Sequence, residues 1–189
     1  MSDTDDSGTN LWGRADEREF SYAVTIPGTS QPVILKAVQE RETCAGTPAF
    51  PSHGHCVWDA ALLLADYLQT RCCELAAGLG GDGRFQFQGK RVVELGAGVG
   101  LVGMTLAVLG AQVALTDQDY VLPLLAKNVA VNFSSADSSQ ARVVATAPVV
   151  EKCQWGEPFE SCGILKSWAK SVDVVVFSDV LYHDSAYQR

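Results

Sequence analysis

The spacing of hydrophobic positions changes several times along the chain, and each change predicts a different element. Apolar and polar residues alternate over residues 20–26, and a proline–glycine turn separates them from a second extended stretch over 33–38. This pattern predicts an N-terminal β-hairpin. After Val57 the apolar residues recur at helical spacing and predict an amphipathic helix. Its apolar face comprises Trp58, Ala61, Leu62, Ala65 and Leu68.

Short apolar runs rich in valine predict the strands of a buried sheet. We expect strands over residues 91–95, 113–116, 142–146 and 172–178. A helix that continues to Leu109 separates the first two strands, and Gly110 stands at its expected C-cap. Another helix is expected over 121–131, with Pro123 in its first turn. The sequence therefore predicts one α/β domain.

The stretch from Arg91 to Asp117 carries the strongest chemical signal. It predicts a strand, a glycine turn, a helix and a second strand, and Asp117 follows Gly96 by about 20 residues. Glycines let a ligand approach the backbone closely, and the N–H groups at the start of the helix point to the same place. A carboxylate at the end of the second strand can accept both hydroxyl hydrogens of a ribose. We therefore expect an adenosine-containing cofactor.

Two cofactors compete for this turn, and charge separates them. Three of its glycines formally satisfy the G-x-G-x-x-G fingerprint of dinucleotide-binding proteins. However, Glu94 precedes the turn, and no lysine or arginine occurs between Arg91 and Lys127 to offset its repulsion of a pyrophosphate. S-adenosyl-L-methionine has a sulfonium and an ammonium group and no phosphate. We therefore favour the methyl donor over a nicotinamide dinucleotide.

Composition narrows the class of protein further. The 189 residues are 47% hydrophobic and 19% charged, with a net charge of −8. These values are typical of a globular domain that binds a basic partner rather than nucleic acid. Residues 1–19 are expected to form a disordered acidic tail, and residues 20–189 the domain. The start of the chain does not resemble an export signal, and we expect a protein of the cytoplasm, with the nucleus as a second compartment.

The cysteines do not predict a metal centre. None of the six forms a C-x-x-C pair, so free thiols in a reducing compartment are expected. Cys44, His53, His55 and Cys56 lie near one another in sequence, but their spacing matches no standard zinc site. We therefore predict no metal.

Three aromatic or acidic groups outside the turn are further candidates. Trp58 is better explained as a core anchor than as a ligand contact, although its place before the cofactor unit leaves both interpretations open. Trp155 lies in the loop after the third strand, where packing and ligand contact are equally good explanations. Asp179 and Tyr182 follow directly on the fourth strand, and we favour a functional role over a helix cap there.

These residues occur in an order that resembles the seven-β-strand protein-lysine methyltransferases of the methyltransferase-like 21 group, also called methyltransferase family 16. The resemblance spans about residues 20–185 and is carried by six features in one order. These are W-D-A-A at 58–61, E-L-G-A-G-V-G at 94–100, Asp117, the asparagines at 128 and 132, Trp155, and D-V-L-Y at 179–182. It implies a Rossmann-like class I methyltransferase sheet with helices on both faces and strand order 3-2-1-4-5-7-6.

The resemblance also implies roles for individual residues. Trp58 would border the methyl donor, Asp117 would bind its ribose, Trp155 would flank its adenine and Ser178 would line the pocket floor. Gly96, Ala97 and Gly98 would form the turn beneath the cofactor. Asp179 and Tyr182 would face the substrate nitrogen. Enzymes that methylate nucleic-acid bases carry two prolines where this chain has Val180 and Leu181, so the implied substrate is a lysine of a protein, such as a chaperone or another abundant cytosolic protein.

Only four of the seven strands of this fold are expected here, so the C-terminal strands are missing and residues 174–177 would form an exposed apolar edge. Three function classes therefore remain. The first is a protein-lysine N-methyltransferase that orients and desolvates the lysine amine, and the second is a cofactor-binding protein that lacks catalysis or is completed by a partner. The third is a nicotinamide-dependent oxidoreductase.

Overall fold

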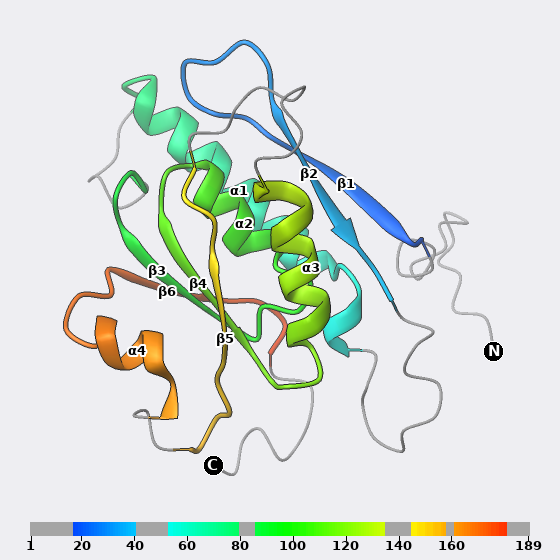
Figure 1. The fold of residues 1–189 in the computed structure, drawn as a ribbon. Coiled ribbons are helices and arrows are strands. Elements are labelled where there is room, and N and C mark those ends of the chain that lie inside the picture. The colour runs from blue at the N-terminus through cyan, green and yellow to red at the C-terminus, as the bar shows by residue number, and fades with distance from the viewer. Residues whose placement is uncertain (1–16, 41–52, 80–85, 135–144, 158–160, 181–189) are drawn as a thin grey trace.

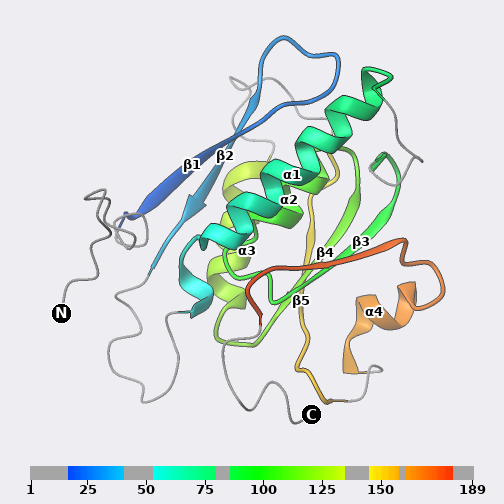
Figure 2. The same ribbon diagram turned by 180° about the vertical axis from the view of Figure 1, so that it is seen from behind.

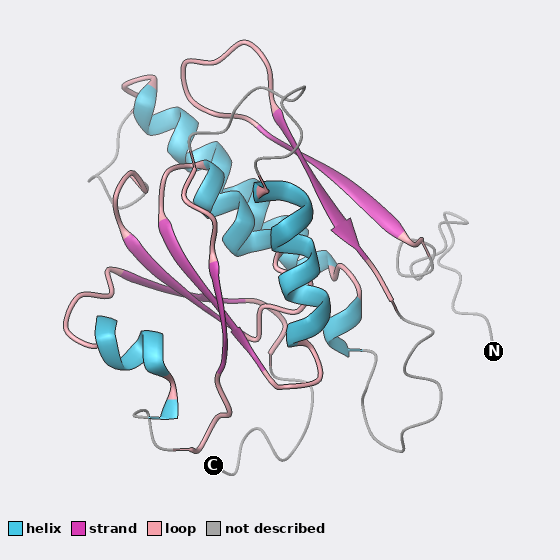
Figure 3. Ribbon diagram, in the orientation of Figure 1, coloured by secondary structure: helices cyan, strands magenta, loops and turns pink. Residues whose placement is uncertain are grey.

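The computed structural model describes residues 17–40, 53–79, 86–134, 145–157 and 161–180. The hairpin strands are β1 (Glu19–Val24) and β2 (Val33–Val38), and the sheet strands are β3 (Arg91–Leu95), β4 (Gln112–Asp117), β5 (Val149–Lys152) and β6 (Val174–Phe177). The helices are η3 (His53–His55), α1 (Asp59–Ala76), α2 (Leu101–Val108), α3 (Leu122–Phe133) and α4 (Gly163–Trp168). Figure 3 distinguishes these elements by type.

The expected N-terminal hairpin is present. β1 and β2 pair antiparallel, from Glu19 opposite Val38 to Val24 opposite Val33. Its side chains alternate between solvent and core, and Val24, Leu35 and Ala37 are buried. Tyr22 connects the hairpin to α1 by two hydrogen bonds. Its hydroxyl donates to Asp66 Oδ1 at 2.6 Å and accepts from Gln69 Nε2 at 2.6 Å.

A four-stranded parallel sheet forms the centre of the fold, in the order β5-β4-β3-β6. This order confirms the first four positions of the expected class I arrangement, with β3 and β4 as its first and second strands. β6 is an edge of the described sheet, as expected, and its Val175 and Phe177 side chains are exposed. Because all strands run in one direction, their carboxyl ends lie along a single edge.

One strand prediction was wrong in position. The third strand is Val149–Lys152 rather than residues 142–146. Residues 145 and 146 are not in a strand, and residues 142–144 lie outside the described part of the chain. The chain has two similar valine pairs, at 143–144 and 149–150, and the second pairs with Ala114 and Leu115 of β4. Local pattern does not distinguish the two pairs, and the strand at residues 149–152 is defined by its pairing with β4.

The helices cover the sheet unequally. Figures 1 and 2 show α1, α2 and α3 on one side, between the sheet and the hairpin, and α4 on the other. Every residue of α2 is buried, which explains why that helix is apolar all round. The expected apolar face of α1 is also confirmed, since Ala65 and Leu68 are buried and Ala61 and Leu62 pack against the core. None of the helices in the described ranges is long and apolar enough to cross a membrane.

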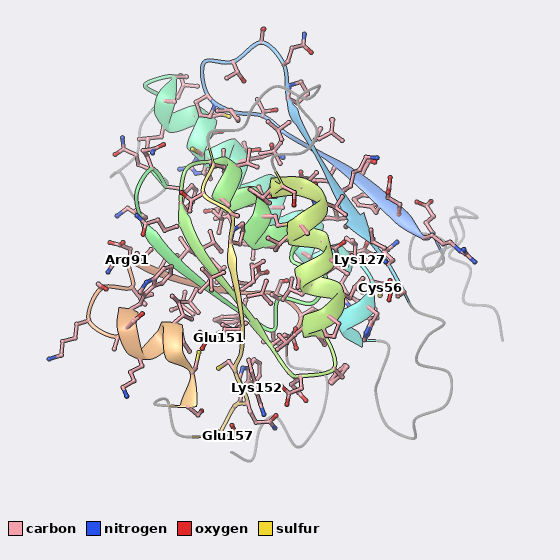
Figure 4. The ribbon with its side chains drawn as sticks, in the orientation of Figure 1. Cys56, Arg91, Lys127, Glu151, Lys152 and Glu157 are labelled. Carbon is pink, nitrogen blue, oxygen red and sulfur yellow. The ribbon has the colours of Figure 1, made fainter. Side chains whose placement is uncertain are left out.

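Two polar contacts hold α4 against the sheet, and Figure 4 labels the sheet residues involved. Glu151 of β5 accepts hydrogen bonds from the backbone N–H groups of Gly163 and Ile164, both at 2.6 Å. The guanidinium carbon of Arg91 lies 5.6 Å from the centre of the Trp168 ring. The first contact satisfies N–H groups that the first turn of a helix leaves without partners.

Candidate functional site

The glycine turn after β3 requires backbone conformations that other residues rarely adopt. Gly96, Gly98 and Gly100 have φ angles of 64°, 55° and 86°, all in the left-handed region. Gly100 is the N-cap of α2, and a Cβ built there would lie 2.6 Å from Leu125 Cδ1. The turn thus brings the start of α2 to the carboxyl end of β3, as the sequence predicts.

Asp117 lies at the end of β4 and is bonded directly to this turn. Its Oδ2 accepts from the backbone N–H of Gly98 at 2.7 Å, and its Oδ1 accepts from that of Gln118 at 2.7 Å. Burial raises the pKa of this carboxyl, while the two backbone hydrogen bonds lower it. A carboxylate has about four acceptor positions, so each oxygen keeps capacity for a hydroxyl donor. The predicted ribose-binding residue is therefore oriented by the turn that would lie beneath the ribose.

Glu94 has a different environment from the one expected. Its side chain is 2% exposed, and Oε2 accepts from the backbone N–H of Gly103 at 2.8 Å. Burial raises the pKa of Glu94 to about 8, so its neutral form is favoured far more than that of an ordinary carboxyl. It holds the first turn of α2 from beneath. Burial raises the pKa of both Glu94 and Asp117, and the role of Glu94 in selecting a sulfonium cofactor over a pyrophosphate stays a prediction.

The ends of β5 and β6 bring two further predicted regions to the turn. A Cβ built on Gly96 would lie 2.9 Å from Val180 Cγ1 and 3.8 Å from Cζ2 of Trp155. Trp155 and Ser178 are half-buried and Asp179 is exposed. Asp179 has a φ of 53°, the one left-handed non-glycine residue in the described ranges. Such conformations are concentrated at functional sites. Tyr182 lies outside the described residues.

The segment before α1 covers the turn from another side, which the sequence analysis missed. A Cβ built on Gly98 would lie 3.5 Å from the carbonyl oxygen of Gly54. His55 is buried, stacks on Tyr120 with ring centres 5.9 Å apart, and lowers the pKa of Asp117 by its charge. Only the short H-G-H sequence before W-D-A-A could have indicated this contact. Trp58 follows as the N-cap of α1 and is half-buried, between the two interpretations left open for it.

The described residues contain no group of three or more histidine, cysteine or acidic side chains that could hold a metal ion. Cys44, one of the four residues considered for zinc, lies outside those ranges. The described cysteines are all free thiols, as the sequence predicts; they are Cys56, Cys72, Cys73, Cys153 and Cys162.

The residues present fit a nucleoside with a positively charged substituent. The turn offers close backbone approach beside Asp117, and a partly buried tryptophan, Trp155, adjoins Gly96. Among the described residues of β3, α2 and β4 the only lysine or arginine is Arg91, at the opposite end of β3. Lys152 lies opposite Asp117 at the end of β5, and it pairs with Asp119 at 2.9 Å. This donor set suits ribose and adenine better than phosphates.

Comparison with known proteins finds relatives that are named lysine methyltransferases. The chain is 33% identical over 130 residues to EEF1A lysine methyltransferase 3 of Xenopus tropicalis, an alignment that covers 68% of this chain and 46% of the relative. It is 34% identical over 131 residues to protein N-lysine methyltransferase METTL21A of Mus musculus, covering 69% and 49% of the two chains. It is 32% identical over 143 residues to protein-lysine N-methyltransferase EFM6 of Saccharomyces cerevisiae, covering 69% and 52%. The chain thus spans about half the length of the curated relatives it matches.

Among solved structures, a similar one is the 16S rRNA N2 G1207 methyltransferase RsmC of T. thermophilus in complex with AdoMet and guanosine. The identity is 24% and the TM-score 0.36, over 61% of this chain and 26% of that one. Residues 47–189, most of the chain, match the lysine methyltransferase family. The chain, with its parallel sheet and its glycine turn bonded to Asp117, belongs to the lysine methyltransferase family.

Proposed function

We propose that this protein binds S-adenosyl-L-methionine and transfers its methyl group to a lysine side chain of a protein. The observation that carries the proposal is the bond between Gly98 and Asp117 at the carboxyl ends of β3 and β4, in a chain of this family. This bond supports the proposal, because nucleoside-binding α/β folds use a carboxylate at the end of the second strand to hold ribose hydroxyls.

Each part of the site would hold one part of the cofactor. Asp117 would accept the ribose hydroxyls, Gly96, Ala97 and Gly98 would lie under the cofactor, and Trp155 would flank the adenine. Trp58 and Ser178 would border the remainder. The cofactor supplies an electrophilic methyl group when bound, and the protein's task is to align the attacking nitrogen with it.

The lysine amine must lose its proton before it can attack. Its ordinary pKa is about 10.4, and desolvation lowers that value. Asp179 is suited to orient the amine, because its left-handed backbone sits at the end of β6, next to Val180, which covers Gly96. Tyr182 lies outside the described residues. Its ring would line the channel that receives the lysine side chain and would hold the ammonium cation there.

A basic, abundant cytosolic protein is the substrate class we propose. The net charge of −8 favours association with a positively charged surface that bears the lysine. EEF1A appears in the name of one relative, and EEF1A and chaperones are the first candidates to assay. The cytoplasmic location expected from the sequence stays a prediction.

A second candidate function is cofactor binding without catalysis, or with catalysis completed by a partner. The observation in its favour is the apolar edge of the described sheet, where Val175 and Phe177 of β6 are 51% and 56% exposed. An apolar strand edge of this kind favours further pairing.

Calorimetry and a methyl-transfer assay test the proposal together. Separate titrations with S-adenosyl-L-methionine and with NAD should show binding of S-adenosyl-L-methionine and no binding of NAD. Binding of NAD alone would overturn the proposed function. A radiolabelled methyl donor mixed with cell extract and this chain should label a protein band, and acid hydrolysis should release methyl-lysine. Binding without any labelling would support the second candidate instead.

A further inference from the structure

A buried asparagine on α3 joins the hairpin to the glycine turn. Asn128 is 0% exposed. Its Oδ1 accepts from the backbone N–H of Val38 at 2.8 Å, and its Nδ2 donates to the carbonyls of Val38 and Val99, both at 3.1 Å. The partners determine the orientation of the amide, because a backbone N–H can meet only the oxygen and carbonyls only the nitrogen. One side chain therefore binds β2 and the turn at once.

A second asparagine, one helical turn later, provides a natural comparison. Asn132 Oδ1 accepts from the N–H of Lys36 at 2.8 Å, and its Nδ2 donates to the Lys36 carbonyl at 2.7 Å. The two amides lie along β2 in the way that a neighbouring strand would, two residues apart. Asn132 also donates to the carbonyl of Asn128 within α3, but no bond runs from it to the glycine turn in the described structure. Both residues dock the hairpin, and Asn128 additionally binds Val99.

The bond to Val99 acts on the conformation of the turn. The carbonyl of Val99 and the N–H of Gly100 belong to one planar peptide group. The hydrogen bond from Asn128 to this carbonyl therefore restricts rotation of the peptide group, and with it the left-handed φ of Gly100. Asp117 fixes the neighbouring N–H of Gly98, and Glu94 fixes that of Gly103. The turn is thus held by β3, β4 and α3 together.

We propose that Asn128 is a positioning residue that orders the glycine turn for its ligand through its hydrogen bond to the Val99 carbonyl, in addition to docking the hairpin. The part that concerns cofactor affinity rests on the proposed function. Loss of the side chain removes one of the two hydrogen bonds that hold the peptide between Val99 and Gly100 in the described structure. The bond from the Gly100 N–H to the Ala97 carbonyl, at 2.8 Å, remains, and the cofactor must then complete the ordering of the peptide on binding. A cost near that of one buried hydrogen bond, about 1.4 kcal/mol, corresponds to about tenfold weaker binding.

The experiment compares Asn128→Ala with Asn132→Ala by hydrogen exchange of the unliganded chain and by calorimetry with S-adenosyl-L-methionine. Both variants should speed exchange in residues 33–38. Asn128→Ala alone should speed exchange in residues 96–100, by about tenfold, and weaken cofactor binding about tenfold. Asn132→Ala should leave the dissociation constant within about twofold of wild type.

Equal exchange in residues 96–100 for the two variants would overturn the proposal, since Asn128 would then be only a docking residue. The exchange arm needs no ligand: faster exchange in Asn128→Ala, with no cofactor binding by wild type, would support the positioning role and contradict the proposed function. If Asn128→Ala does not fold, Asn128→Ser in trimethylamine N-oxide replaces it, because that osmolyte favours compact states and serine is too short to bridge both partners.

Discussion

The backbone N–H of Gly98 donates a hydrogen bond of 2.7 Å to Oδ2 of Asp117. This bond joins the glycine turn after β3 to the end of β4, so the two features that the sequence assigns to one cofactor are in direct contact. The orientation of the carboxylate is set before any ligand binds. Preorganisation of this kind reduces the ordering cost of binding.

Replacing Asp117 with asparagine should weaken binding of S-adenosyl-L-methionine by tenfold or more, about 1.4 kcal/mol or above. The variant loses the negative charge and one of the acceptors for the ribose hydroxyls. Asp119→Asn is the matched control, because that exposed residue pairs with Lys152 at 2.9 Å and should affect binding little. Calorimetry measures both, and equal affinities for the two variants would contradict the ribose role.

Asp179→Asn should abolish most methyl transfer while leaving cofactor affinity unchanged. Asparagine tolerates the left-handed region as aspartate does, so the φ of 53° should persist and only the charge is lost. The comparison is single-turnover transfer from a radiolabelled donor, with Asp119→Asn again as control. Full turnover by the variant would remove Asp179 from the mechanism.

Glu94→Gln should become more stable relative to wild type as pH rises. The pKa of Glu94 is raised from its ordinary value of 4.5 to about 8 by burial, so the folded protein retains a proton that the unfolded chain releases. The free energy of unfolding of wild type therefore falls between about pH 4.5 and pH 8 and is constant above that range. The total fall is about 1.4 kcal/mol for each unit of pKa shift. Glutamine can still accept from Gly103 but does not titrate. Urea unfolding across this range measures the difference, and parallel pH profiles would show that Glu94 ionises normally.

Gly96→Ala should destabilise the protein by about 1–3 kcal/mol, from the left-handed φ and from contact with Val180. The added Cβ would lie 2.9 Å from Val180 Cγ1, so Val180→Ala should relieve part of the loss. A double-mutant cycle by chemical denaturation measures the coupling. Strictly additive effects would mean that the end of β6 does not cover the turn in solution.

Tyr22→Phe should lower the free energy of unfolding by about 1–2 kcal/mol, because Asp66 and Gln69 lose their shared hydroxyl partner. Tyr67→Phe, on an exposed side chain of α1, should have a smaller effect. Thermal and urea denaturation measure both. A loss no greater than that of Tyr67→Phe would mean that the hairpin is attached by apolar packing alone.

Much of this fold is predictable because its signals are local. The glycine turn, β2 and β3 lie where the pattern predicts them, since hydrophobic spacing and glycine placement act over a few residues. The position of β5 depends on pairing with β4, which is a long-range choice between two similar valine pairs. The proximity of His55 to Asp117 depends likewise on how the segment before α1 lies over the turn. The raised pKa of Glu94 follows from its burial, whereas sequence alone assigns a carboxyl its ordinary pKa.

The docking of β2 on α3 has a consequence for where this domain can be divided. The family match begins at residue 47, yet the backbone groups that satisfy Asn128 and Asn132 belong to Lys36 and Val38. An excised piece that starts at the match would leave two amides on α3 without those partners and uncover the apolar side chains beneath the hairpin. A piece that keeps these contacts therefore includes β2, together with β1, which pairs with it.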